Sequence, residues 1–260
     1  MVGSLTVGQR IVTMTDELSD ICTALKQKGF NLVGVADGRG YQAHLSGCQS
    51  AIVFANGGTE GWNHFVADIR AFPEHLSAHQ HPLDDFVSRC IQQVDPNPPS
   101  SRRWIQCADT AEVFIDFQQL GREAGLGQSS PVGLLIHPEY GLWVSLRMVL
   151  LTTELLESTN LRPHPCASCL EKPCIKACPS GAVTPQGWSV QTCASFHQTS
   201  TLCKGVCHSR LVCPVGGQHR HSRLQHLYHN ARTEGRKQLA KELGIVDAQE
   251  GLDPKWSDWQ

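Results

Sequence analysis

Apolar and polar positions in the first 160 residues alternate between two periodicities. Residues 15–30, 83–94 and 111–125 repeat apolar side chains at the three- and four-residue intervals of amphipathic helices. Short apolar runs bounded by turn residues predict strands at 31–36, 50–56 and 103–107, and two more within 132–153 joined by a Pro138–Gly141 turn. Because helices alternate with strands, we expect a layered domain of the α+β or α/β class.

A change in charge marks the end of this domain. Residues 1–160 contain 17 acidic residues against 10 Lys and Arg, whereas residues 161–230 contain one acidic residue, Glu171, against seven Lys and Arg. The stretch 157–165, ESTNLRPHP, also has the composition of a linker. We therefore predict a domain at 1–160, a cysteine-rich module at 161–218 and a helical tail at 219–260.

The overall composition narrows the class of protein. Of the 260 residues, 40% are hydrophobic, and the formal net charge is −2, which does not favour a general nucleic-acid binder. No apolar run approaches the roughly 20 residues that span a bilayer, and the first residues lack the pattern of a secretory signal. We expect a cytoplasmic protein without a membrane partner.

Cysteines supply the chemistry. Eight of the 12 cysteines fall within 48 residues, and in a cytosolic protein such a group indicates metal binding rather than disulfides. They are Cys166, Cys169, Cys174, Cys178, Cys193, Cys203, Cys207 and Cys213. Prolines follow Cys178 and Cys213. The run is related to the C-x2-C-x2-C-x3-C-P run of bacterial ferredoxins, with a longer loop, LEKP, after the second cysteine.

Eight thiolates suit two [4Fe–4S] clusters with four ligands each. By ferredoxin logic, one cluster takes Cys166, Cys169, Cys174 and Cys213, and the other takes Cys178, Cys193, Cys203 and Cys207. An alternative pairing exchanges Cys178 with Cys213. Two structural zinc sites of four cysteines each are the other interpretation; the crowding of three cysteines before a Cys-Pro pair favours iron and sulfur.

The segment 122–153, REAGLGQSSPVGLLIHPEYGLWVSLRMVLLTT, followed by CASC, CIKACPSGA and CPVG, resembles epoxyqueuosine reductases and, more distantly, reductive dehalogenases. The resemblance implies a nitroreductase-like N-terminal α/β domain that holds base-off cobalamin, followed by a bacterial dicluster ferredoxin-like module. It covers roughly residues 105–215. Epoxyqueuosine reductases carry a Trp and a Lys where this chain reads AGLGQSSPVG, so it is a divergent, short member without their C-terminal helical repeats.

Site residues follow from the same resemblance. Asp109, in CADTA, matches the catalytic aspartate of a D-[ST]-A-P motif and would donate a proton. Ser129, Ser130 and Gly133 of QSSPVG would border the corrinoid, and Tyr140 would lie beside it. For each of these residues, a plain loop, cap or packing role is the alternative.

The tail is basic and rich in histidine. His226 and His229 share a helical face and could hold a metal, but a basic helix packed over the cysteine-rich module is the preferred interpretation. Because the tail lacks interleaved aromatic residues, we do not expect nucleic acid as a partner.

These features together predict an iron–sulfur reductase that passes electrons through two [4Fe–4S] clusters to a cobalamin or substrate in the N-terminal domain. The expected partners are an electron-donor protein of the ferredoxin or flavodoxin type and a small-molecule or corrinoid substrate. Two alternatives are a ferredoxin-type electron carrier whose N-terminal domain only docks partners, and a tRNA-modifying epoxyqueuosine-type reductase. The missing helical repeats count against the tRNA-modifying alternative.

Overall fold

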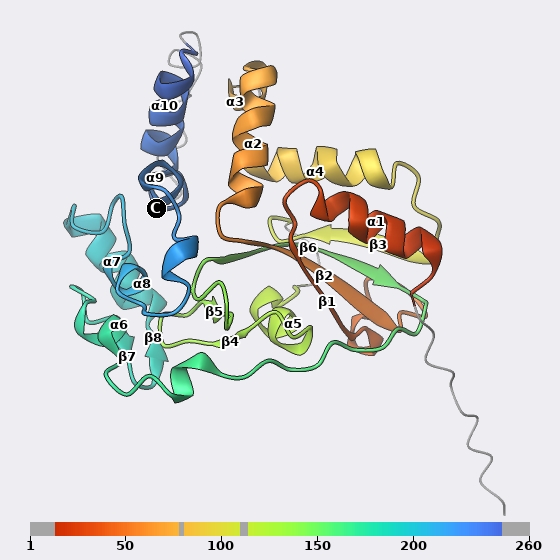
Figure 1. Cartoon of the computed structure of the whole chain (residues 1–260), viewed down its shortest axis with the longest axis horizontal. Coiled ribbons are helices and arrows are strands. Elements are labelled where there is room, and N and C mark those ends of the chain that lie inside the picture. Colours follow the sequence, from red (N-terminus) through yellow and green to blue (C-terminus); the bar gives the residue numbers. More distant parts are fainter. Residues whose placement is uncertain (1–13, 78–80, 110–113, 246–260) are drawn as a thin grey trace, which may run out of the picture.

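The computed structural model describes residues 14–77, 81–109 and 114–245. Its centre is a sheet of four antiparallel strands in the order β1-β2-β6-β3 (Figure 1). The strands are β1 (Leu32–Asp37), β2 (Ser50–Gly57), β6 (Val144–Thr152) and β3 (Arg102–Gln106). The mixed α/β fold expected from the sequence is present. Because every neighbouring pair of strands is antiparallel, the sheet matches the α+β class rather than the parallel α/β class.

Both faces of the sheet are covered, which explains why all eight residues of β2 are buried. Side chains alternate between the faces: Ile52 and Phe54 belong to one core cluster, and Ala51, Val53 and Ala55 to the other. The first face is covered by α1 (Asp16–Lys26), α2 (Glu60–Ala71), α3 (Glu74–Ser77) and α4 (Pro82–Val94). The second face is covered by α5 (Phe117–Glu123) and the short helix η1 (Arg39–Tyr41).

Two predicted elements differ from the expectation. The helix expected at 111–125 is described only from Phe117, where Asp116 caps its first turn by accepting a hydrogen bond from Gln119 N at 3.0 Å; residues 110–113 lie outside the described part. The two strands expected within 132–153 do not pair with each other. Instead β5 (Leu135–Ile136) pairs with β4 (Gln128–Ser129), while β6 joins the central sheet.

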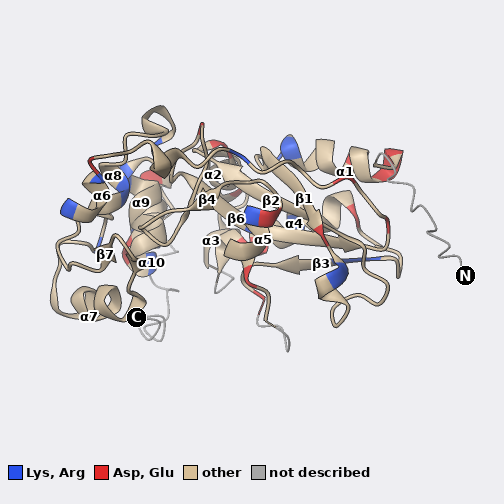
Figure 2. Ribbon diagram, turned by 90° about the horizontal axis from the view of Figure 1, so that it is seen from below, with Lys and Arg blue, Asp and Glu red and all other residues tan. Residues whose placement is uncertain are grey.

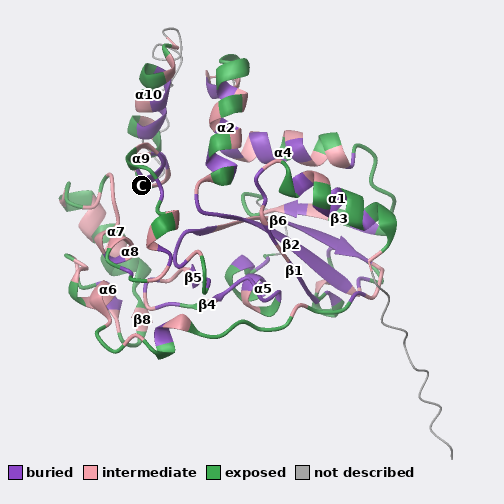
Figure 3. Ribbon diagram, in the orientation of Figure 1, coloured by how far each residue is buried: buried purple, intermediate pink, exposed green. Residues whose placement is uncertain are grey.

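The cysteine-rich segment consists of short elements joined by loops. They are η2 (Pro165–Ala167), α6 (Pro173–Lys176), β7 (Val183–Thr184), β8 (Gly187–Trp188), α7 (Val190–Thr199), α8 (His208–Leu211) and η3 (Gly217–His219). Helix α7 has no buried residue, and Figure 3 shows this segment mostly exposed or half-buried beside the buried strands. Its small apolar cluster includes the cysteines Cys166 and Cys213 among its buried members.

The tail forms α9 (Arg223–Asn230) and α10 (Arg232–Leu243), which stand beside α2 (Figure 1). Tyr228 places its ring 5.0 Å from that of Trp62 and 5.5 Å from that of Phe65, measured between centroids. The tail was expected to pack over the cysteine-rich module, but it packs mainly against the first domain. Aromatic contacts draw α9 into the core of the first domain, and Leu227 touches the module near Gly205.

Two glycines join the module to the first domain. Gly141, with a φ of +57°, lies in the turn before β6, and Gly216, with a φ of +72°, follows the second Cys-Pro pair. A Cβ atom at Gly141 would lie 2.0 Å from the carbonyl oxygen of Val215, and one at Gly216 would lie 2.4 Å from that of Tyr140. The backbones of the two segments therefore meet without room for a side chain.

Replacing Gly141 by alanine is expected to lower the free energy of unfolding by on the order of 2–4 kcal/mol, because it adds left-handed backbone strain to a steric clash. Gly244→Ala is the matched control: Gly244 has a φ of +70°, and none of the described residues lies within 4 Å of the added Cβ, so only about 1 kcal/mol should be lost. Urea denaturation of both variants measures the difference. Equal losses would show that the close contact at Gly141 contributes nothing.

Candidate functional site

Four thiols come together from three parts of the cysteine-rich segment. Cys166 lies in η2, Cys174 at the start of α6 and Cys213 just after α8, and Cys169 lies on the loop between η2 and α6. Burial raises the pKa of Cys166; Lys172 opposes that rise, and the neighbouring thiolates of Cys213, Cys174 and Cys169 add to it. The four sulfur atoms are thus close enough to interact electrostatically.

A second set of four thiols lies beside the first. Burial raises the pKa of Cys203, and the thiolates of Cys207, Cys178 and Cys193 raise it further. Cys193 is carried by α7, whereas Cys207 caps the start of α8. The thiols that interact electrostatically are those that ferredoxin spacing groups together, and their role as ligands of two clusters stays a prediction.

The loop between Cys169 and Cys174 contains a residue in the left-handed conformation. Lys172 adopts a left-handed conformation, with a φ of +42°, just before Pro173 begins α6. This residue belongs to the LEKP loop that is longer than the ferredoxin spacing, and its Nζ donates a hydrogen bond to the carbonyl oxygen of Cys166. Lys172 therefore turns back towards Cys166, whereas Leu170, 90% exposed, lies in solvent.

Cys178 differs from its neighbours. Burial acts to raise the pKa of its thiol, but the Ser180 hydroxyl and the backbone amides of Val183, Ser180 and Ala182 together hold that pKa below its usual value. Thiolate sulfur is the form that binds metal, and hydrogen bonds to sulfur tune the reduction potential of a cluster. The Ser180 Oγ atom lies 3.3 Å from the Cys178 Sγ atom, and the role of Cys178 as a ligand stays a prediction.

The donor chemistry of both sets fits iron–sulfur clusters, which are held by four thiolates each. Among residues 14–77, 81–109 and 114–245, no three His, Cys, Asp or Glu side chains converge on a point that could hold a single metal ion. Basic residues lie on two short helices of the cysteine-rich segment, Lys176 on α6 and Arg210 on α8 (Figure 2). Of these, Arg210 is held 4.6 Å above the Trp143 ring and donates to the Leu142 carbonyl at 3.0 Å.

The residues that the resemblance assigns to a corrinoid are engaged within the chain. Trp188 of β8 covers Gly133, where an added Cβ would lie 2.4 Å from the indole ring. The Ser130 hydroxyl donates to the Leu134 carbonyl at 2.7 Å. The Tyr140 ring stacks on His219, with 4.4 Å between centroids. Ser129 accepts a hydrogen bond from Arg122 at 2.9 Å.

Asp109 is exposed in the turn after β3, where its Oδ2 accepts a hydrogen bond from the Gln106 amide at 2.7 Å. The structure therefore places this carboxylate as a turn cap. The remainder of its motif, Thr110 and Ala111, lies outside the described residues. Its catalytic role stays a prediction.

A group of buried polar side chains was not assigned from the sequence. His221, His226 and Trp143 pack together, with ring centroids 5.1 to 5.7 Å apart. Ring nitrogens of all three lack a hydrogen-bond partner among the described residues. The histidine-rich tail signalled the two histidines, but Trp143 lies just before β6, in an apolar run whose pattern reveals only burial.

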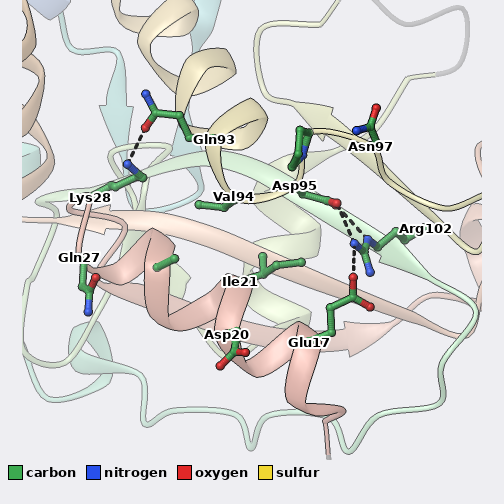
Figure 4. A pocket seen from close by; sticks show the side chains of 12 residues that line it. Glu17, Asp20, Ile21, Gln27, Lys28, Gln93, Val94, Asp95, Asn97 and Arg102 are labelled. Atoms are coloured by element: carbon green, nitrogen blue, oxygen red, sulfur yellow. Dashed lines mark hydrogen bonds and ion pairs between the residues drawn. The ribbon is translucent and has the colours of Figure 1, made fainter.

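A cleft of about 770 Å³ opens between α1 and the end of α4 (Figure 4). Arg102 lies between Asp95 and Glu17 there, and Lys28 donates to Gln93 at 2.6 Å. The ion pairs of Arg102 with Glu17 and Asp95 connect β3 to α1 and to the end of α4. Because these charges are already paired with one another, we assign the cleft a structural role. None of the helices that the structure describes has the length and hydropathy needed to span a bilayer.

No family model matches the sequence. An epoxyqueuosine reductase of Synechococcus sp. (strain RCC307) is 33% identical over 116 residues, which are 44% of this chain and 34% of that protein. An epoxyqueuosine reductase of Gloeobacter violaceus is 33% identical over 104 residues, which are 36% of this chain and 32% of that protein. The chain thus spans about a third of the length of the curated relatives it matches.

Solved structures share the fold at low sequence identity. An epoxyqueuosine reductase with a tRNA stem loop superposes with a TM-score of 0.55 at 16% identity, covering 81% of this chain and 68% of that one. The reductive dehalogenase NpRdhA gives 0.54 at 14%, covering 97% and 39%. The B12-trafficking protein CblC of C. elegans gives 0.54 at 12%, covering 87% and 96%.

One expectation is overturned by these comparisons. The sequence argued against nucleic acid as a partner, but a protein of this fold is solved with a tRNA stem loop, and the curated relatives carry the same enzyme name. Net charge and the lack of interleaved aromatics were therefore poor guides to RNA binding. The resemblance to epoxyqueuosine reductases and reductive dehalogenases is confirmed, at about 33% identity for the former and by shared fold for both.

Proposed function

We propose that the chain is an iron–sulfur reductase of the epoxyqueuosine reductase type, which passes electrons through two [4Fe–4S] clusters to a modified nucleoside in tRNA. The observation that carries this proposal is the gathering of eight cysteines into two interacting sets of four. The named relatives supply the substrate class. Reduction of an epoxide consumes two electrons and two protons and releases the oxygen as water, so an electron path is what the reaction requires.

Electrons would enter through the set that contains Cys193. Helix α7, which carries this cysteine, has no buried residue, and none of the four cysteines of the set is buried. In the other set, Cys166 and Cys213 are 9% and 6% exposed. An exposed cluster can approach a donor protein of the ferredoxin or flavodoxin type, and the more buried one faces the first domain.

Cobalamin is the second cofactor that the solved neighbours suggest, since one of them is described by B12-dependent dehalogenation. The residues assigned to it do not fit a corrinoid as they are placed here. Trp188 fills the space at Gly133, and His219 covers Tyr140. We therefore derive no step through a corrinoid.

Because Trp188 and His219 fill the space at Gly133 and Tyr140, one further candidate is favoured. It is the electron carrier whose first domain only docks partners. Its distinguishing property is electron transfer without reduction of a nucleoside.

The test is an anaerobic assay with reconstituted protein, a chemical reductant and a tRNA stem loop that contains epoxyqueuosine. We expect the nucleoside to lose one oxygen atom, as read by mass spectrometry, with wild-type protein and with Cys107→Ala, a cysteine outside both sets. Cys213→Ala should be inactive. Unchanged RNA, together with rapid electron transfer to an artificial acceptor by protein that retains both clusters, would favour the electron carrier instead.

A further inference from the structure

A small basic cavity lies between the start of α4, strand β6 and the two tail helices. Its volume is about 70 Å³, and its lining includes the guanidinium groups of Arg147, Arg232 and Arg236. The carboxylate of Asp84 lies in the same lining, and Asp85 acts on Arg236 from nearby. Counted without the histidines, three positive charges against two negative ones leave the site cationic.

Arg147 is the central group of this cavity. Its Nε donates to the Asn56 Oδ1 atom at 3.0 Å, and among the described residues no acceptor is bonded to its two terminal nitrogens. Burial lowers the pKa of Arg147, and Asp84 is the main group that opposes this. An arginine keeps its charge in proteins, so the two terminal nitrogens of Arg147 can donate hydrogen bonds to a bound anion.

Neighbouring polar atoms also lack partners. His229 lines this cavity and a smaller one of about 10 Å³ on the other side of Arg147. Among the residues that the structure describes, its Nε2 has no hydrogen-bond partner, nor have the Gln225 Oε1 atom and both ring nitrogens of the adjacent His226. Each such buried atom costs about 1–3 kcal/mol. Of these three residues, His229 lines the larger cavity, where a bound polar group would supply a partner for its ring.

The ring state of His229 suits an anion without adding charge. Burial lowers the pKa of His229 well below its ordinary value, and the nearby Arg147 and Arg210 lower it further. The neutral imidazole still has one N–H to donate. Because water occupies about 30 Å³ of liquid, a cavity of 70 Å³ accepts a group the size of a phosphate.

We propose that this cavity, formed by Arg147, Arg232, Arg236 and His229, binds a phosphate group. The planar fork of an arginine matches two phosphate oxygens at once, and His229 Nε2 can donate to a third. The phosphate could belong to a small ester or to an RNA backbone. The inference does not rest on the proposed reductase activity, because it concerns binding alone.

The test is calorimetric titration of the full-length protein with inorganic phosphate. We expect saturable binding of one phosphate, weakened about tenfold or more in Arg147→Gln. Asp84→Asn should act in the opposite direction and tighten binding about threefold, since it removes a facing negative charge. Arg223→Gln, which removes an exposed charge of α9 outside the cavity, is the matched control and should bind like wild type.

A further variant protects the test against misfolding. Arg232 is exposed at its place in the lining, so Arg232→Gln should fold normally and still weaken phosphate binding about threefold. Absence of phosphate binding to wild-type protein would overturn the proposal. Equal weakening by Arg223→Gln and Arg147→Gln would overturn it as well, because it would indicate general charge attraction.

Adding an unmodified RNA stem loop distinguishes the two sources of phosphate. If the stem loop displaces inorganic phosphate and Arg147→Gln weakens RNA binding, the cavity holds a backbone phosphate of RNA. If phosphate binds unchanged in the presence of saturating RNA, the cavity serves a small phosphate ester. Both results support a phosphate site, and neither depends on nucleoside reduction.

Discussion

Replacement of Cys213 by alanine is expected to lower the iron content of anaerobically reconstituted protein from about eight to about four atoms per chain, because one four-iron cluster loses a ligand. Cys213 is 6% exposed and interacts with Cys174 and Cys169, so no solvent ligand can easily take its place. Cys107→Ala, in the first domain, should retain about eight iron atoms. Colourless protein with stoichiometric zinc would contradict the assignment.

Double variants decide which cysteines share a cluster. Cys166 and Cys213 belong to one thiol set, so replacing both should remove the same cluster and still leave about four iron atoms. Replacing Cys166 together with Cys178 should remove both clusters. The alternative pairing, with Cys178 and Cys213 exchanged, reverses these two results. Iron and sulfide analysis, with the visible absorbance of the clusters, measures both.

The second large effect concerns stability. Arg102 and Asp95 form a buried ion pair with two hydrogen bonds, of 2.9 and 2.7 Å, and their side chains are 6% and 3% exposed. Trp104 Nε1 also donates to Asp95 at 2.8 Å. Asp95→Ala leaves the buried Arg102 guanidinium paired with Glu17, whose side chain is 67% exposed, so its charge is poorly compensated. Asp95→Ala should therefore lower the free energy of unfolding by about 3–5 kcal/mol, measured by urea denaturation.

An exposed ion pair provides the control. Asp37 bonds Arg39, and their side chains are 52% and 66% exposed, so Asp37→Ala should cost less than about 1 kcal/mol. A double variant, Asp95→Leu with Arg102→Met, should recover much of the loss because it removes both buried charges. A loss in Asp95→Ala no larger than that in Asp37→Ala would show that the buried pair does not stabilise the fold.

The stabilisation by the Asp95–Arg102 ion pair depends on pH and is lost in acid. Burial acts to raise the pKa of Asp95, but hydrogen bonds from Arg102 and Trp104 outweigh it and hold the pKa below its ordinary value. Because the pKa is lower in the folded state, the stabilisation is present above the unfolded-state pKa. It is lost as the pH falls through the folded value. The difference in stability between wild type and Asp95→Ala should therefore shrink in acid.

Local pattern predicted the strands well and the helices less evenly. The apolar runs at 31–36, 50–56 and 103–107 correspond to β1, β2 and β3, since β-branched and aliphatic runs bounded by turns are a strong local signal. Helix α2 was not predicted. Gly57 and Gly58 indicated a turn, and the polar residues that follow concealed the packing of Trp62 and Phe65 against a tail more than 150 residues later.

Some features of the candidate site could be predicted from the sequence, and others could not. Ligand spacing lies within short loops, so the sequence could suggest both thiol sets. The partners of Gly133, Tyr140 and Arg147 lie on distant segments, namely Trp188, His219 and the tail helices. Such contacts depend on tertiary arrangement, which periodicity does not contain. The sequence argued against nucleic acid because net charge averages over the chain, and such an average says nothing of a local basic cavity.

The return of α9 to the first core has a topological consequence. Tyr228 and Leu239 share one apolar cluster with Leu18 and Phe54, so the cysteine-rich segment is a long insertion anchored at both ends. Doubling the length of such a closed loop costs only about 0.6 kcal/mol in entropy. Without the proposed clusters, the first domain and the tail helices would therefore still be held together by this shared core. Binding the clusters again would require only the cysteine-rich segment to refold.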